Sequence, residues 1–491
     1  MARTPSATAR TRPAVKLSDP QRDSFALNLP EHIRINFAGL PVPSPQPGAP
    51  PTKLPPGLRG LPMLGVALDF QNKPLEMIRE GHRRYGPIFS SNFMGSPIIW
   101  LLGPEANEFV LSSNASNFLW RPALMRVVCL MGEGMITSDG ALHDQQRELV
   151  MPALHSQQVA SYLDTMIDAT DRVLETWPVD HEINVFEEMR QITLQIVARA
   201  LLGQDLGQSQ AALREWFMIA GKYLDLSPPF NALRLNIPGT PWAKFVRARA
   251  GIDALLLDMI AQRRAQPGTR GDVLDALVGA HRAAGAALAD EQIRDLCMTL
   301  LVTALNEPAN MMTWMLYLID KHPHVREQLV DEQRRVLGDR PPTLADLQEL
   351  TYLDLVIKET LRLYPAIWIS MRLAIGPFSF GGYDFHAGTF VGLPRYLTHR
   401  MPEIFAEPEA FKPERFDPVH GEQHPAYAYL PFGAGARICP GAGLAVMEGK
   451  VIMARLLRRF RLSLRPGYTA TPHVGVTLGV RGGLPMLVRA V

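Results

Sequence analysis

One glycine-rich segment, Phe432 to Gly441, has the residue types and spacing of a loop that holds a single thiolate. Its glycines permit backbone geometries that residues with a Cβ resist, so main-chain N–H groups can approach a sulfur anion closely. The residues after Gly441 are mostly good helix formers, and Pro440 suits the first helical position. Cys439 is therefore expected at a helix N-terminus, where the helix dipole and free amides lower the pKa of a thiol.

A thiolate in such a loop has three chemical uses. A nucleophilic cysteine needs a nearby base, and the loop contains no histidine, although a distant one could fold against it. Zinc needs several ligands, usually at short spacing, whereas this loop has one cysteine and no C-x-x-C pair. Haem needs one thiolate, an aromatic shield and cations for its propionates, and Phe432 and Arg437 meet the last two needs. The whole pattern favours haem over a buried structural cysteine.

The motif F-x-x-G-x-R-x-C-x-G, as it stands here, resembles the haem-binding signature of the cytochrome P450 superfamily. Two more segments match this family in the same order: Glu359 to Arg362 resembles its E-x-x-R helix, and Phe411 to Phe416 its P-E-R-F segment. The resemblance implies a mainly α-helical fold with a small β region, in one domain over residues 55–491. Residues 1–54 are expected to form a flexible N-terminal tail and a proline-rich linker.

The resemblance also implies a cofactor, haem b, with Cys439 as the ligand of its iron. The residues that match haem-contacting positions of the family are Phe432, Arg437, Gly441, His143, Arg147 and Arg372. His143 and Arg147 are four apart on a predicted helix, so both face one way, and an arginine fork suits a propionate.

A buried ion cluster is expected on the thiolate side of the haem. The resemblance pairs Glu359 and Arg362, three apart on one helix, with Arg415 of the P-E-R-F segment. Burying such a cluster is costly unless each partner satisfies the others. We expect its role to be structural, fixing the cysteine loop.

The segment from Leu300 to Asn310 departs from the family. Typical members carry a small-residue pair, one further residue, an acid and then a threonine, and the acid and the alcohol deliver the protons that O₂ activation needs. This chain has Asn306 at the acid position and Glu307 at the alcohol position. Pro308 follows, which removes a helical N–H and kinks the helix. A shift of one residue would place Glu307 at the acid position, with the alcohol still missing.

Three interpretations of this departure stay open. In the first, Glu307 has a pKa raised by burial and donates protons, so oxygenation persists. In the second, Asn306 binds a substrate oxygen, and the enzyme isomerises or dehydrates an already oxidised substrate, or acts as a peroxygenase, without electrons. In the third, both side chains hydrogen-bond the backbone that Pro308 frees. A haem-binding sensor without turnover is a further alternative.

Composition excludes several other classes of protein. The formal charge of +2 gives no indication of nucleic-acid binding. The longest apolar run, Leu296 to Ile319, is interrupted by Asn306, Glu307 and Asn310, so we expect a core helix and no transmembrane anchor. The three cysteines are far apart, which fits a reducing cytoplasm without disulfides.

The expected reaction is the oxidation of a hydrophobic small molecule, such as a lipid, a terpenoid or another secondary metabolite. The apolar stretch from Phe118 to Ile136 matches a lid over the family's substrate pocket, and the hairpin expected from Val474 to Val491 would point its Gly482–Gly483 tip into that pocket.

No flavin or NAD(P) segment is visible, so an external redox partner such as ferredoxin and its reductase would supply electrons, with O₂ as co-substrate. Four basic residues after the cysteine form either a partner-docking surface or a solvated helix face: Lys450, Arg455, Arg458 and Arg459.

Overall fold

The computed structural model describes residues 34–35, 41–42, 54–203, 205–207, 209–226, 234–266, 268, 272–280 and 287–491. Most of the expected N-terminal tail lies outside these residues, as does the middle of the loop between residues 224 and 242. Across the described ranges, no helix combines the length and the apolar character needed to cross a bilayer.

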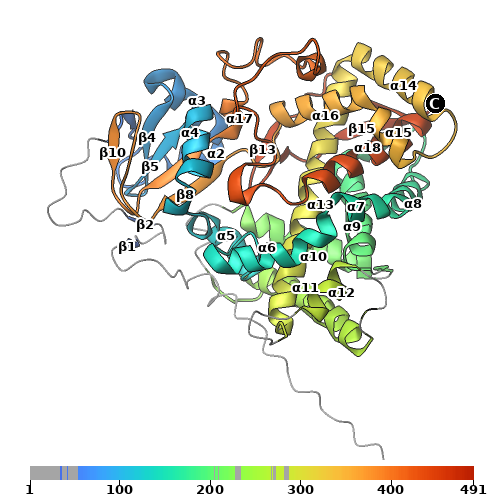
Figure 1. Cartoon of the computed structure of the whole chain (residues 1–491), viewed down its shortest axis with the longest axis horizontal. Helices are drawn as coiled ribbons and strands as arrows, with labels where there is room; N and C mark the ends of the chain where they lie inside the picture. The colour runs from blue at the N-terminus through green and yellow to red at the C-terminus, as the bar shows by residue number, and fades with distance from the viewer. Residues whose placement is uncertain are drawn as a thin grey trace, which may run out of the picture.

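Helices dominate the described chain (Figure 1). In chain order they are α2 (Ala67–Asn72), α3 (Pro74–Tyr85), α4 (Pro104–Glu108), α5 (Met125–Met131), α6 (Gly140–Leu154), α7 (Ser156–Ser161), α8 (Leu163–Leu174), α9 (Val185–Ala200), α10 (Ser209–Leu224), α11 (Pro241–Ala265), α12 (Val273–Gly279), α13 (Asp290–Lys321), α14 (Pro323–Leu337), α15 (Leu344–Glu349), α16 (Thr351–Leu363), α17 (Arg395–Thr398) and α18 (Ala442–Arg459).

The long helix α13 runs through the centre of the helical part (Figure 1). Its residues between Ile293 and Ile319 are buried on most sides, as expected of a helix inside a large core. It packs against α9, α11, α16 and α18. Pro308 lies inside α13, and the helix continues beyond it to Lys321. The predicted core helix is therefore present.

The strands gather mainly to one side of the molecule (Figure 1). A six-stranded sheet has the order β3-β4-β5-β11-β8-β6, and three smaller sheets among the residues from 54 onward have the orders β12-β15-β7, β13-β14 and β10-β9. The strands are β1 (Arg34–Ile35), β2 (Pro41–Val42), β3 (Gly57–Leu58), β4 (Ile88–Phe93), β5 (Ser96–Leu101), β6 (Phe118–Leu119), β7 (Glu182–Asn184), β8 (Ser370–Ala374), β9 (Phe378–Phe380), β10 (Tyr383–Phe385), β11 (Phe390–Leu393), β12 (Phe460–Leu464), β13 (Pro472–Val474), β14 (Leu478–Val480) and β15 (Pro485–Ala490).

The six-stranded sheet brings two basic residues of the site close together. Strands β8 and β11 are antiparallel, with Arg372 opposite Val391 and Ser370 opposite Leu393. Helix α17 begins at Arg395, two residues after β11 ends. The pairing therefore places Ser370 and Arg372 beside the start of α17.

The prediction for the C-terminal hairpin was wrong about its tip. Strands β13 and β14 pair Val474 with Leu478, so the turn is formed by residues 475–477. The Trp368 indole N–H donates to the carbonyl of Gly475 at 3.2 Å, which fixes this turn against the start of the β8 segment. Gly482 and Gly483 instead connect β14 to β15, and β15 pairs with β12. The position of the tip depends on which segments pair as strands, and a pair of glycines in the sequence does not predict that pairing.

Gly435 cannot be replaced by a larger residue without a shift of the backbone. Its φ of +68° is in the left-handed region, and a Cβ at this position would collide with the carbonyl oxygen of Leu111. Gly443, eight residues later in α18, has nothing within 4 Å of the equivalent position.

We expect Gly435→Ala to destabilise the protein and Gly443→Ala to leave it unchanged or slightly more stable. The left-handed φ alone costs about 1–2 kcal/mol in a residue with a Cβ, whereas alanine within a helix is better than glycine by about 1 kcal/mol. Apparent melting temperatures from circular dichroism give the comparison. Equal melting temperatures for the two variants would contradict the collision.

Glu448 in α18 is a buried acid that the structure leaves without a partner. It is 1% exposed, and neither carboxyl oxygen accepts a hydrogen bond within the described residues. Burial raises its pKa to about 8, so it is neutral at pH 7 in the folded chain. In the unfolded chain the same group ionises at its ordinary pKa.

Glu448 should make the folded state less stable as the pH rises from about 4.5 to about 8, because only the unfolded chain releases the proton in this window. At about 1.4 kcal/mol per pKa unit, the effect is at most about 5 kcal/mol. Glu448→Gln should therefore match the parent near pH 4.5 and exceed its melting temperature near pH 8. A constant difference across this range would contradict the assignment.

Candidate functional site

The Cys439 loop is closed by its own backbone hydrogen bonds. The N–H of Cys439 donates to the carbonyl of Phe432 at 2.8 Å, and the N–H of Ile438 donates to that of Gly435 at 3.1 Å. The Cys439 residue is exposed. Helix α18 follows with Gly441 as its N-cap residue, so Pro440 lies before the helix and does not take the predicted first helical position.

The predicted direction of the Cys439 pKa was wrong. Although Cys439 is accessible, desolvation by the protein around its thiol raises the pKa above the ordinary value. The N–H of Gly441 and the positive charges of Arg395 and Arg147 act in the opposite direction. The helix terminus thus contributes as predicted, but desolvation outweighs it. The Glu307 carboxyl, when ionised, also raises the pKa of this thiol, so this part of α13 lies within electrostatic range of the cysteine loop.

The structure brings Glu359, Arg362 and Arg415 together in a buried cluster. The Glu359 carboxylate receives two hydrogen bonds from Arg362, at 2.7 and 2.8 Å, and one from Arg415 Nε at 3.0 Å. Glu359 and Arg362 are both 0% exposed. Arg362 also donates to three backbone carbonyls, and Arg415 to the Glu422 carboxylate. Every charge in this cluster therefore has a partner, as burial requires.

His399 connects this cluster to the cysteine loop. Its Nε2 accepts a hydrogen bond from the N–H of Leu430 at 2.9 Å, just before the loop, and its Nδ1 lies 3.3 Å from the carbonyl of Arg362. Burial and neighbouring arginines lower the pKa of His399 to about 3, so the ring is neutral and fits one donor and one acceptor role. His399 thus links the Glu359 cluster to the segment that leads into the cysteine loop.

Asn306 and Glu307 lie half-buried on α13, on a surface that the core does not cover. Neither side chain hydrogen-bonds another side chain or the backbone of another residue in the described ranges. The carbonyl that Pro308 deprives of its helical partner is that of Ala304, and neither side chain binds it. The structure thus gives no support to a purely structural role. Burial raises the pKa of Glu307 to about 8, so it carries a proton at neutral pH.

The predicted basic residues converge beside the cysteine loop. Arg147 Nη1 donates to the carbonyl of Ile438 at 2.9 Å. Arg437 donates to Asp139 at 2.7 Å and to the carbonyl of Ser138 at 2.6 Å. His143 is buried, and its Nδ1 lies 2.8 Å from Asp144. Burial lowers the pKa of His143, which favours the neutral ring at pH 7.

Asp139 is the N-cap residue of α6, but its side chain has a role outside that helix. Its carboxylate makes no cap hydrogen bond and instead accepts from the backbone N–H groups of Trp120 and Arg121, at 3.1 and 2.8 Å. It also pairs with Arg437. The carboxylate therefore orders the start of the 120s segment and neutralises one arginine of the site.

Arg372 is the predicted cation with the least compensation. It is 4% exposed, and its guanidinium lies 3.6 Å from the centre of the Trp120 ring. The hydrogen bond that it donates goes to the carbonyl of Met371, at 2.9 Å. Burial, together with the like charges of Arg395 and Arg437, lowers its pKa well below the ordinary value. A buried cation in this state needs an anion.

Unsatisfied donors at the same place show that the residues fit haem carboxylates. The indole N–H of Trp120 and the Nε–H of Arg395 are buried and have no hydrogen-bond partner among the described residues. Such orphaned donors are rare in native proteins and call for a missing ligand or water. Together with the exposed Cys439, they form a site with a thiolate on one side and cations at the edge, which suits haem.

Sequence reasoning missed Trp120 and Arg395. Trp120 was assigned only to the apolar lid, and its orphaned N–H becomes visible only when Arg372 packs on its ring. Arg395 belongs to none of the recognised motifs. One available signal was the presence of a single arginine in an otherwise apolar stretch that leaves β11.

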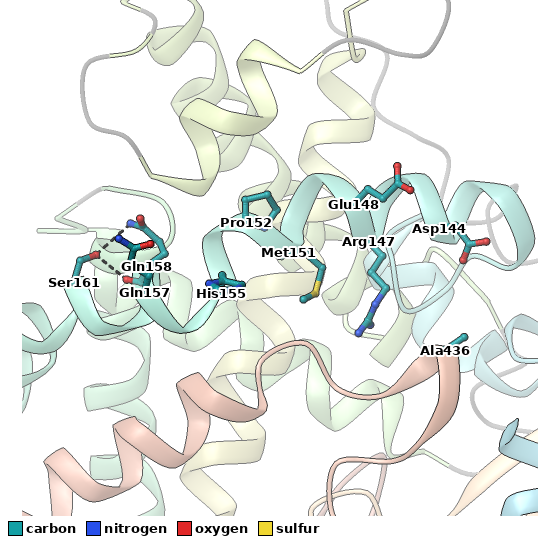
Figure 2. Close-up of a pocket in the computed structure, with 10 residues that line it drawn as sticks. All are labelled: Asp144, Arg147, Glu148, Met151, Pro152, His155, Gln157, Gln158, Ser161 and Ala436. Carbon is teal, nitrogen blue, oxygen red and sulfur yellow. Dashed lines mark hydrogen bonds between the residues drawn. The ribbon is translucent and has the colours of Figure 1, made fainter. Parts of the chain in front are cut away.

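The four basic residues of α18 do not form a free basic surface. Each pairs with a carboxylate: Lys450 with Asp354, Arg455 and Arg459 with Asp171, and Arg458 with Asp339. The basic residues of the suggested docking surface are therefore all paired with acids, although Arg455 and Arg459 share Asp171. An open groove of about 1120 Å³ lies instead along α6 and α7 and reaches Ala436 of the cysteine loop. Figure 2 shows Arg147 pointing from α6 toward this loop.

Comparison with known proteins agrees with this geometry. Residues 55–475 match the family model described as Cytochrome P450. The chain is 34% identical to "Putative cytochrome P450 139" of Mycobacterium tuberculosis, over 82% of this chain and 97% of that protein. It is 30% identical to "Cyclooctatin synthase" of Streptomyces melanosporofaciens, over 85% and 92%.

A solved structure shows the same fold. "Retinoic acid bound cyanobacterial CYP120A1" superposes with a TM-score of 0.82 and 28% identity, covering 90% of this chain and all of that one. The predicted fold class, mainly α with a small β region, is confirmed. The sequence matches and the shared fold establish that this chain belongs to the cytochrome P450 family of Cys-ligated haem monooxygenases and is an oxidoreductase.

Proposed function

We propose that this protein uses O₂ and externally supplied electrons to oxidise a hydrophobic small molecule. The observation that carries the proposal is the place of Glu307, a half-buried carboxyl on α13 within electrostatic range of Cys439, whose pKa burial raises to about 8. A proton donor on one side and a thiolate on the other are the two groups that O₂ activation at haem requires.

Haem b is the proposed cofactor, and when bound it supplies the oxygen-activating chemistry. Cys439 would ligate its iron, with Phe432 and Gly441 beside the sulfur. Arg372, Arg437 and the indole N–H of Trp120 would hold its carboxylates. The Glu359 cluster and His399 keep the cysteine loop in one conformation, which fixes the position of the thiolate.

Glu307 would replace the usual acid and alcohol as the source of protons. Its side chain is half-buried and is not held by another residue of the described chain, so it can hydrogen-bond a water or substrate. Burial keeps its proton in place at neutral pH. The carbonyl of Ala304, which Pro308 leaves without its helical N–H, offers an acceptor one helical turn away. These two groups can hold a water between them and deliver protons from it.

Two observations support a terpenoid-like substrate. The half-buried apolar side chains of Val302 and Ala304 lie on α13 within about one helical turn of Asn306 and Glu307. Named relatives handle terpenoids: one solved structure contains retinoic acid, and a rice relative with 29% identity is an abscisic acid 8'-hydroxylase. We therefore propose a largely apolar substrate with few polar groups.

An external ferredoxin with its reductase is the proposed electron source. The cysteine loop reaches the surface at the groove along α6 and α7, where Ala436 lines it together with Arg147 and Glu148. A partner on this face would be separated from Cys439 by only the short loop. The proposed docking face is therefore this groove and not the side of α18, whose basic residues are engaged in salt bridges.

A rearrangement without electrons is the second candidate, and Asn306 favours it. The Asn306 amide is half-buried and free of hydrogen bonds to other described residues, so it can bind a substrate oxygen. The two candidates assign the essential role to different neighbours on α13, which makes them separable by mutation.

If Glu307 delivers protons, Glu307→Ala should lower product formation by about 100-fold, the smaller end of the effect of a general acid. Consumption of NADPH should continue, so the coupling of electrons to product falls as well. Asn306→Ala, the matched neighbour, should change product formation by less than about tenfold, the loss of one hydrogen bond. Turnover with a terpenoid panel, NADPH, ferredoxin and reductase provides the measurement.

The reverse pattern would reject the monooxygenase proposal. Activity on a lipid hydroperoxide without electrons, lost in Asn306→Ala and kept in Glu307→Ala, would establish the rearrangement. Full coupling in Glu307→Ala would remove Glu307 from proton delivery.

A further inference from the structure

Arg395 is a buried cation to which neither the sequence motifs nor the family assignment gives a role. It is the first residue of α17 and is 6% exposed. Its Nη2 donates to the hydroxyl of Ser370 at 2.6 Å, while its Nε–H is buried without a partner in the described chain. A neutral hydroxyl is a poor counterpart for a buried guanidinium, because it leaves the charge uncompensated.

Three neighbours place Arg395 between the cysteine loop and β8. A Cβ built on Gly433 would lie 3.4 Å from Arg395 Nη2, so the guanidinium is next to the loop backbone. The charge of Arg395 acts on the Cys439 sulfur and on Arg372 of β8. The guanidinium therefore lies at the edge of the space that faces both the thiol and the other arginines of the site.

The charges around this space do not balance within the protein. The charges of Arg395 and Arg437 each lower the pKa of Arg372, and the carboxylate of Asp139 acts in the opposite direction. Asp144 and Arg147, which also act on Arg437, cancel one another. Among guanidiniums and carboxylates alone, three positive charges and one negative charge leave two positive charges. Haem carries two carboxylates, so the balance closes only when Arg395 is counted with the other two.

We propose that Arg395 is a cofactor-binding residue whose positive charge and orphaned Nε–H hold a haem carboxylate, with Ser370 fixing the guanidinium in place. The inference concerns cofactor retention and does not depend on which substrate is oxidised. A competing explanation is purely structural: Arg395 holds β8 against α17 through Ser370. That role needs a hydrogen bond but no charge. Variants that remove the charge and the hydrogen bond separately therefore distinguish the two explanations.

The first measurement is the rate at which the purified holoenzyme loses haem to an excess of apomyoglobin. Arg395→Gln keeps a donor for Ser370 and removes the charge, and it should lose haem about tenfold faster, as expected for one charge-assisted hydrogen bond. Arg395→Lys keeps the charge, and Ser370→Ala keeps the whole guanidinium. Both should stay within about threefold of the parent, a change below 1 kcal/mol.

The second measurement is the reduction potential of the same holoenzymes, which a structural role would not move. A positive charge near haem favours the reduced form, so the potential should become more negative in Arg395→Gln and stay near that of the parent in Arg395→Lys and Ser370→Ala. If Arg395→Gln retains no haem during purification, the comparison of Arg395→Lys with Ser370→Ala still tests the proposal.

Each possible outcome of these measurements either supports or contradicts the proposal. Fast haem loss with a lowered potential in Arg395→Gln, or failure of that variant alone to keep haem, supports the proposal. Parent-like haem retention in Arg395→Gln would overturn it. A Ser370→Ala variant that loses haem as fast as Arg395→Gln would also overturn it, because the hydrogen bond and not the charge would then be decisive. So would an Arg395→Lys variant that loses haem as fast as Arg395→Gln, because the packing of the guanidinium and not the charge would then be decisive.

Discussion

Buried positive charge that the chain does not neutralise by itself is the constraint on which the rest of this site depends. Two clusters of buried arginines lie near the cysteine loop. In the Glu359–Arg362–Arg415 cluster every charge meets a carboxylate or a carbonyl. Around Arg372 and Arg395 a single carboxylate faces three guanidiniums, and buried donors remain unpaired. The fully paired Glu359 cluster supports the cysteine loop. The incompletely paired cluster around Arg372 and Arg395 requires a dianionic ligand, and a haem with two propionates is such a ligand.

The same reasoning accounts for the altered central helix. Pro308 and Glu307 replace a pattern in which an acid and an alcohol share proton delivery. Burial gives the one remaining carboxyl group a raised pKa, so a single residue can hold the proton that two residues handle elsewhere. Because Glu307 is neutral when protonated, it adds no second negative charge near the Cys439 thiolate. The departure from the family pattern is thus compatible with its usual chemistry.

Motifs and periodicity predicted much of this fold and the cysteine side of the site. The expected core helix is present as α13, and the Glu359 cluster forms with the expected partners. The failures share one cause, which is that they depend on contacts between distant segments. The pKa of Cys439 follows from desolvation by the assembled core, and the cations of α18 meet acids from distant segments. Arg395 carries no periodic signal, so its neighbours Ser370 and Arg372 become known only from the fold.

The central claim is that the sulfur of Cys439 binds the haem iron, and the absorption spectrum of the reduced, carbon monoxide-bound protein tests it most directly. The account predicts the strongly red-shifted Soret band of thiolate ligation in the parent and in a variant with alanine at Cys129 and Cys297. It also predicts that Cys439→Ser loses this band. A parent protein that takes up no haem, or a Cys439→Ser variant that keeps the red-shifted band, would contradict the account.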